Sequence, residues 1–291
     1  MTTATSPANI EGFASSTADG FKNRMDARCY DSIRGVARQL DFTADTAIEI
    51  HDLNRLAETM RPPVTTASQK PLHFVTQETE PAKLSYEAQI YATGAVPTRH
   101  GVLHDSFNAL VWLSLPRTKA ALNAHQVAAQ QNATNSRIRT PPQDALTLFD
   151  ECGVIVASDC PELLAMIDGF QWKTLFWERR AEVIGHMKFF LFGHGLMEQI
   201  LNPYVGLTGK ALLLEVQTAW LEAAPDMALS LIDSACRELI GSAGALSHGQ
   251  ELRPLPVLGI PGWAAENEAE AYYDNVQYFR PGRISARQRT K

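Results

Sequence analysis

The stretch from Gly94 to His125 is the part of the sequence richest in side chains that could do chemistry. It holds three histidines, two arginines, one lysine, one aspartate and two asparagines, separated by apolar residues at helical spacing. Imidazole and carboxylate groups together are common ligands of zinc, manganese and iron. We therefore expect His104, Asp105 and His125 to bind a divalent metal ion that assists a hydrolytic reaction.

The same stretch supplies hydrogen-bond donors for an anionic ligand. Guanidinium, ammonium and imidazole groups bind phosphate or carboxylate through charge-assisted hydrogen bonds. We expect the contacts to a small anionic substrate to come from Arg99, His100, Asn108, Lys119 and Asn123. Without a metal, the same donors would make a non-catalytic binding protein for a phosphate or carboxylate, and that alternative stays open.

Two residues further along the chain are candidates for proton transfer. Asp150 lies beside Glu151 between two short apolar runs, and His194 lies where a predicted strand turns into a helix. We expect catalytic roles for Asp150 and His194, with Glu151 as the alternative to Asp150, because carboxylates and imidazoles act as general acids and bases. The structural alternative is a buried hydrogen-bonded network in which Arg99 and Lys119 pair with Asp105 and Asp144, and an aspartate in a turn is often only a turn former.

Apolar periodicity, caps and breakers predict the elements that position these side chains. Helices are expected over 28–40, 44–60, 103–115, 161–169, 172–184, 207–223 and 225–240, and Pro116 can begin another. Strands are expected over 72–75 and 186–192, and a β-hairpin over 145–157 would have Asp150 in its turn. Gly94 and Pro97 indicate a loop that presents Arg99 and His100.

These elements predict one α+β domain, predominantly helical, with a small sheet that includes the hairpin near Asp150. Residues 1–20 are rich in Ser, Thr and Ala and are expected to be disordered, while 21–291 form a single globular domain. Residues 254–283 are expected to run over the surface as an extended C-terminal segment. Its aromatic rings either pack on the core or form an interface for a protein partner; they are Trp263, Tyr272, Tyr273, Tyr278 and Phe279.

Composition excludes several classes of function. A net charge of −6 and a pI of about 5.8 give no electrostatic reason to expect nucleic acid as a partner. No apolar run is long enough for a membrane span, and the start of the chain lacks the pattern of a signal peptide. The four cysteines never form a CxxC pair, which favours reduced thiols and a cytoplasmic protein. Serine-hydrolase, dinucleotide-binding and P-loop signatures are absent from the sequence, and nothing in it indicates an oligomeric state.

The chain also resembles a bacterial family of domains of unknown function, number 3025 in that series. The resemblance lies in the segments 96–99, 104–113, 116–125, 144–151, 192–194, 259–263 and 279–281. It covers most of the chain after about residue 70. Because the family carries no established activity, the resemblance implies membership and leaves the chemistry to the residues above.

Overall fold

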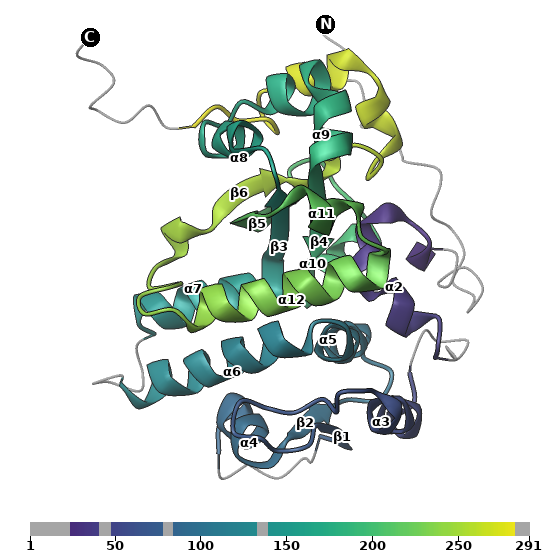
Figure 1. The fold of residues 1–291 in the computed structure, drawn as a ribbon, viewed down its shortest axis with the longest axis vertical. Helices are drawn as coiled ribbons and strands as arrows, with labels where there is room; N and C mark the ends of the chain where they lie inside the picture. The colour runs from purple at the N-terminus through teal and green to yellow at the C-terminus, as the bar shows by residue number, and fades with distance from the viewer. Residues whose placement is uncertain (1–23, 41–47, 78–83, 133–138, 283–291) are drawn as a thin grey trace, which may run out of the picture.

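The computed structural model describes residues 24–40, 48–77, 84–132 and 139–282 of the chain (Figure 1). Helices surround a four-stranded sheet, and a separate two-stranded parallel sheet lies beside helix α4 (Tyr86–Thr93). The predicted α+β class, with a predominance of helix, is confirmed. The predicted disordered segment 1–20 lies outside the described residues. Among the described helices, none has the length and apolar character needed to cross a bilayer.

The main sheet has the strand order β4-β3-β5-β6. Its strand β3 (Gly153–Ser158) runs antiparallel to β4 (Met187–Leu191) and parallel to β5 (Thr208–Glu215), which pairs antiparallel with β6 (Arg253–Pro256). All six residues of β3 are buried, as expected for a short apolar run in the middle of a sheet covered on both faces. The predicted strand over 186–192 is confirmed as β4.

The predicted hairpin near Asp150 is wrong in its first half. Residues 145–149 belong to helix α7 (Pro141–Cys152), and β3 begins directly after that helix. The Gln143 side chain accepts a hydrogen bond from the Thr140 backbone N–H at 2.7 Å, which starts the helix. Ala145, Leu146 and Phe149 are buried on one face of α7, so the apolar run follows helical rather than strand periodicity. Asp150 and Glu151 therefore lie on the last turn of a helix.

Two other segments also differ from the expectation. The predicted helix over 207–223 is strand β5 followed by the short helix α11 (Thr218–Glu222), because residues 210–215 pair with β3 and residues 208–211 pair with β6. The predicted loop at Gly94 contains strand β2 (Ala95–Thr98), which runs parallel to β1 (His73–Thr76). Arg99 thus directly follows a strand, and the strand predicted over 72–75 is confirmed.

The remaining predicted helices are present with shifted ends. They are η1 (Arg28–Tyr30) with α2 (Asp31–Ala37), α3 (Ile50–Thr59), α5 (Leu103–Ser114), α6 (Pro116–Gln131), α8 (Pro161–Asp168) and α12 (Pro225–Gly241). The segment predicted as one helix over 172–184 is a π-helical turn, η2 (Thr174–Glu178), followed by α9 (Arg180–His186). Helix α10 (His194–Ile200) follows β4 and packs against α5, and α12 lies alongside α6 (Figure 1).

The C-terminal segment is held on the protein's own core. Around β6 it forms short 3-10 turns, which are η3 (Gly249–Glu251), η4 (Val257–Gly259), η5 (Ala265–Glu268) and η6 (Glu270–Asp274). The rings of Tyr273, Tyr278 and Phe279 are buried, and the Tyr278 hydroxyl donates to the Leu207 carbonyl at 2.8 Å. The aromatic residues therefore staple this segment to the domain, which leaves three of the five rings unavailable to a partner.

Candidate functional site

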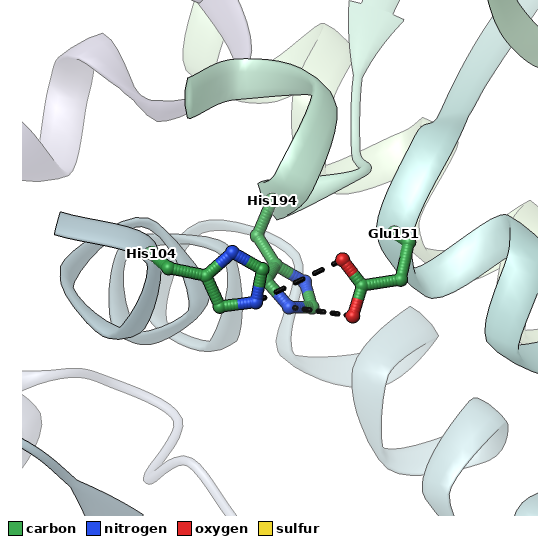
Figure 2. Close-up of side chains that lie close together, drawn as sticks. All are labelled: His104, Glu151 and His194. Atoms are coloured by element: carbon green, nitrogen blue, oxygen red, sulfur yellow. Dashed lines mark ion pairs between the residues drawn. The ribbon is translucent and has the colours of Figure 1, made fainter. Parts of the chain in front are cut away.

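Three side chains from three helices point toward one another and form the candidate site (Figure 2). His104 lies in the first turn of α5, Glu151 in the last turn of α7, and His194 at the start of α10. The Glu151 carboxylate lies 3.8 Å from His104 Nε2 and 3.5 Å from His194 Nε2. One donor atom from each residue lies within 4.8 Å of the other two. A metal with bonds of about 2.1 Å needs its ligands about 3.4 Å apart, so small side-chain movements would complete a site.

A close backbone contact brings two of these residues together. The N–H groups of Phe192 and Gly193 donate to the Gly153 carbonyl at 3.0 and 2.8 Å. This contact joins the end of β4 to the start of β3, and so places the start of α10 beside the end of α7. A Cβ atom on Gly193 would lie 2.4 Å from the Gly153 nitrogen, so the approach requires glycine. His194 and Glu151 owe their proximity to this contact.

A fourth residue, Glu198, fixes the orientation of the His104 ring. Its Oε2 lies 3.1 Å from His104 Nδ1, and it stands one turn after His194 on α10. An ionised carboxylate only accepts hydrogen bonds, so in the neutral ring the proton is on Nδ1 and the Nε2 lone pair faces Glu151. Carboxylates hold metal-binding histidines in this way.

His194 is neutral in the physiological range. Its side chain is 6% exposed, and burial lowers its pKa to about 4. Lys119 and His104 also lower the pKa of His194, while Asp150 raises it. The His194 Nδ1 atom is buried, finds no hydrogen-bond partner among the described residues, and lies 4.0 Å from Asp150 Oδ1. A neutral imidazole is the form that binds a metal ion or accepts a proton.

The environment of the Glu151 carboxyl also favours the binding of a cation. Burial raises the pKa of its carboxyl, and Asp150 and Glu198 add to that effect while His104 opposes it. A bound metal ion would supply the positive charge that favours the ionised carboxylate. The donor set therefore suits zinc, manganese or iron, the metals expected from the sequence.

Lys119 and Asp150 form a buried ion pair behind the site. Lys119 Nζ donates to Asp150 Oδ1 at 2.6 Å, and the two side chains are only 5% and 13% exposed. Burial works to raise the pKa of Asp150, but the Lys119 charge and its hydrogen bond hold that pKa below its ordinary value. The ammonium also lies 5.5 Å from the centre of the Trp112 ring. Lys119 is thus already neutralised, and Asp150 is occupied by it.

Arg99 and Asp105 form a second pair. The guanidinium donates to both carboxylate oxygens, at 2.9 and 2.8 Å, and the Arg99 backbone N–H donates to Oδ2 at 2.8 Å. Burial works against ionisation of Asp105, yet these bonds from Arg99 lower its pKa. In the described structure Asp105 is bound to Arg99 and not grouped with His104.

The remaining predicted site residues lie in different places. Asn108 lines the site cavity, and its amide donates to the Tyr86 hydroxyl at 2.9 Å. Asn123 donates to the Glu87 carboxylate at 2.6 Å. His100 is largely exposed, with Glu49 as its acidic neighbour at 3.7 Å. His125 lies on another face of α6, where it lines a separate cavity of about 1230 Å³. Of the expected ligand set, the structure brings only His104 into the cluster.

A polar cavity of about 410 Å³ opens onto the three candidate ligands. Its walls come from α4, α5, α6, α7 and the chain around Arg99 and Arg139. Side-chain amides, a hydroxyl and charged groups line it: Gln77, Tyr86, Glu87, Arg99, Asn108, Gln126, Gln130, Arg139, Gln143 and Thr147 among them. This size suits a small polar molecule.

Glu87, which the sequence did not single out, faces this cavity from the first turn of α4. Burial raises its pKa to about 7, with Asp150 adding to the effect while Lys119 and the Asn123 amide oppose it. The folded state therefore disfavours the ionised carboxylate, and the free energy of unfolding falls as pH rises from about 4.5 to about 7.

Glu87→Gln removes this ionisation while keeping an oxygen for the Asn123 amide. We expect the variant to match the wild type in stability near pH 4.5 and to exceed it by about 3 kcal/mol at pH 8, since the pKa rises from 4.5 to about 7 and one pKa unit corresponds to about 1.4 kcal/mol. Urea unfolding at the two pH values measures the difference. The exposed Glu178→Gln is the control, and equal stability of wild type and Glu87→Gln at pH 8 would contradict the assignment.

Glu151 and Glu198 are the site residues that sequence reasoning passed over or held only as an alternative. Glu198 stands four residues after His194, a spacing that places both on one face of a helix. That spacing was a usable signal. The apolar run before Glu151 predicts a strand rather than the helix α7, so the sequence leaves the direction of the Glu151 side chain relative to His194 undefined.

Comparison with known proteins gives a family and no activity. The family described as "Protein of unknown function (DUF3025)" matches residues 72–283. This range contains His104, Glu151, His194 and Glu198. Neither a curated protein nor a solved structure matches the chain. Because the match spans well over half of the 291 residues, the chain belongs to the DUF3025 family, as its sequence segments predict.

Proposed function

We propose that the protein is a metal-dependent hydrolase that acts on a small anionic compound, with His104, Glu151 and His194 as the metal ligands. The observation that carries the proposal is the convergence of two imidazoles and one carboxylate at a polar cavity of about 410 Å³. This ligand set replaces the expected set of His104, Asp105 and His125. His194 moves from a catalytic to a ligand role.

The arrangement of the donors supports this reading. Glu198 holds the His104 ring with its Nε2 atom toward the cluster, and burial keeps His194 neutral. Three protein ligands leave coordination positions for water and substrate on the cavity side. A metal ion held there would polarise a carbonyl or phosphoryl oxygen and lower the pKa of a bound water.

A metal-free binding protein for a phosphate or carboxylate is the second candidate. It is favoured by the many neutral amide groups on the cavity wall, which can hydrogen-bond a ligand without reacting with it. Such a protein would gain no stability from a metal and would release its ligand unchanged.

Metal analysis of protein purified without a metal-binding tag tests the first candidate. We expect about one equivalent of metal in the wild type, and a rise in melting temperature on adding zinc or manganese to the metal-free protein. His104→Ala should abolish that rise, and Glu198→Gln should weaken metal binding about tenfold by loosening the His104 ring. If no metal copurifies and none raises the melting temperature of the wild type above that of His104→Ala, the metal proposal fails.

Gly195→Ala tests the geometry without removing a ligand. A Cβ atom at residue 195 would lie 2.5 Å from Glu151 Oε2 and 3.2 Å from the Glu151 carbonyl oxygen. The carboxylate must turn away, so we expect metal affinity to fall at least tenfold, as when a group supporting a ligand is lost. Isothermal titration with zinc measures it.

Gly185→Ala is the matched control, because it is also helical and its Cβ would meet nothing within 4 Å. Both alanines favour the helix by about 0.5–1 kcal/mol, so neither should unfold the protein. Equal zinc affinities in the two variants would argue against Glu151 as a ligand.

We also place this activity in the bacterial cytoplasm. The family resemblance supports a bacterial origin, and all four cysteines lie in the structure as free thiols, which suits a reducing compartment. The acidic net charge supports a small-molecule substrate rather than nucleic acid.

A further inference from the structure

Three cationic side chains lie at or beside the site cavity, and two of them are already neutralised. Lys119 is bound to Asp150 in the protein interior, and Arg99 is bound to Asp105 through both of its oxygens. A substrate anion would have to displace a carboxylate to reach either cation. The expectation that Arg99 and Lys119 contact the substrate anion is therefore weakened by their geometry.

Arg139 is different. It lines the cavity, and its guanidinium donates one hydrogen bond, to the Thr147 hydroxyl at 3.0 Å. Among the residues that the structure describes, no acidic side chain forms an ion pair with it. A guanidinium carries five N–H donors, so most of its hydrogen-bonding capacity faces solvent and the cavity.

The Thr147 hydroxyl, which accepts the hydrogen bond from Arg139, comes from the same helix as Glu151. Thr147 precedes Glu151 by four residues on α7, so the two side chains lie on one face, one helical turn apart. One turn is about 5.4 Å, so Thr147, which holds the Arg139 guanidinium, lies about that distance along the helix from Glu151.

We propose that Arg139 binds the anionic group of the substrate, a carboxylate or a phosphate, in the cavity that opens onto the candidate metal ligands. This inference rests on the proposed function for the position of the reacting bond. It narrows the substrate to a small acid whose anionic group and cleaved bond both fit within the cavity of about 410 Å³. Gln77 and Gln126 on the same cavity wall supply neutral donors and acceptors for the rest of the molecule.

The test uses full-length protein stripped of metal with a chelator, so that an anion cannot bind through a metal ion. Inorganic phosphate and malonate are titrated separately into the wild type, Arg139→Gln and Arg139→Lys by isothermal titration calorimetry. Arg237→Gln, at an arginine on the separate cavity beside His125, is the matched control. Melting temperatures of all variants report whether each is folded.

We expect Arg139→Gln to weaken binding of at least one anion about tenfold, as for the loss of one charge-assisted pair. Arg139→Lys should retain part of the affinity and Arg237→Gln all of it. The anion that binds more tightly to the wild type identifies the substrate as a phosphate or a carboxylate compound.

The inference is overturned if Arg139→Gln binds both anions as the wild type does, or if neither anion binds the wild type. Zinc titration of the same variants tests the proposed metal site independently of anion binding at Arg139. If the wild type does not bind zinc, the hydrolase proposal fails, and Arg139 is then an anion contact of a non-catalytic binding protein.

Discussion

Lys119→Met should reduce the free energy of unfolding by about 3–5 kcal/mol, the usual cost of leaving one member of a buried ion pair alone. Methionine keeps an unbranched side chain of similar length but removes the charge, and with it the contacts of the ammonium with the Trp112 and Phe192 rings. Asp150, 13% exposed, would then be a buried carboxylate without its 2.6 Å partner. Urea unfolding at pH 7 measures the loss.

Two further variants make the interpretation specific. In the double variant Lys119→Met with Asp150→Asn no buried charge is left, so most of the stability should return. Lys173→Met removes a partly exposed lysine that pairs with Glu270 and Asp274, and it should cost far less stability than Lys119→Met because solvent screens exposed ion pairs. Similar losses for Lys119→Met and Lys173→Met would refute the structural role given to the buried pair.

Gly193→Ala is expected to destabilise the protein by about 3 kcal/mol, at the upper end of what overpacking costs. The backbone φ of Gly193 is −64°, which any residue can adopt, so the effect comes from contact alone. The new Cβ would lie 2.4–2.6 Å from backbone atoms of Gly153 and Cys152. These atoms cannot move without breaking the two hydrogen bonds to the Gly153 carbonyl.

Chemical denaturation measures the free energy of unfolding of Gly193→Ala and of the control Gly241→Ala. A Cβ on Gly241, near the end of α12, would meet nothing within 4 Å, so that variant should be within about 1 kcal/mol of the wild type. The Gly193 variant should also lose metal binding if it folds, because His194 and Glu151 separate. A stable Gly193→Ala protein with normal zinc affinity would show that the close approach is not required.

The parts of the fold that sequence reasoning predicted correctly are those with local signals. Proline in the first turn marks the starts of α6, α8 and α12, at Pro116, Pro161 and Pro225. The strand before Gly193 was evident from its run of phenylalanines. These signals depend on neighbours in the chain, so they do not need knowledge of tertiary contacts.

The errors occurred where distant contacts decide the structure. Residues 208–215 are rich in leucine, which favours helices, yet they form the strand between β3 and β6. The segment 145–149 was too short for its periodicity to separate helix from strand. Thr140 and Pro141, which begin its helix, are the local signal in the sequence that favours helix there.

The candidate site was only partly predictable for the same reason. His104 and His194 were singled out by type and local setting, but their grouping with Glu151 depends on the backbone contact between Gly153 and Gly193, 40 positions apart in the chain. The pairing of Arg99 with Asp105 spans six residues, and the sequence predicts it as the structural alternative to a site. That alternative expects Lys119 to pair with Asp144, but Lys119 pairs with Asp150, 31 residues away.

The packing of the N-terminal helices decides how much of the chain before the family match is needed to hold the site. The family match starts at residue 72, but Tyr30, before that boundary, stacks on Phe107 of α5 at 5.9 Å and donates its hydroxyl proton to the Met197 carbonyl at 2.8 Å. Ser32 likewise donates to the Leu191 carbonyl at the end of β4. The Tyr30 contacts brace the two helices that carry His104 and His194, and the Ser32 contact braces the strand before His194. A fragment trimmed to the family boundary would expose this side of the core, so the smallest unit able to hold the site must include Tyr30 and the helix at residues 31–37.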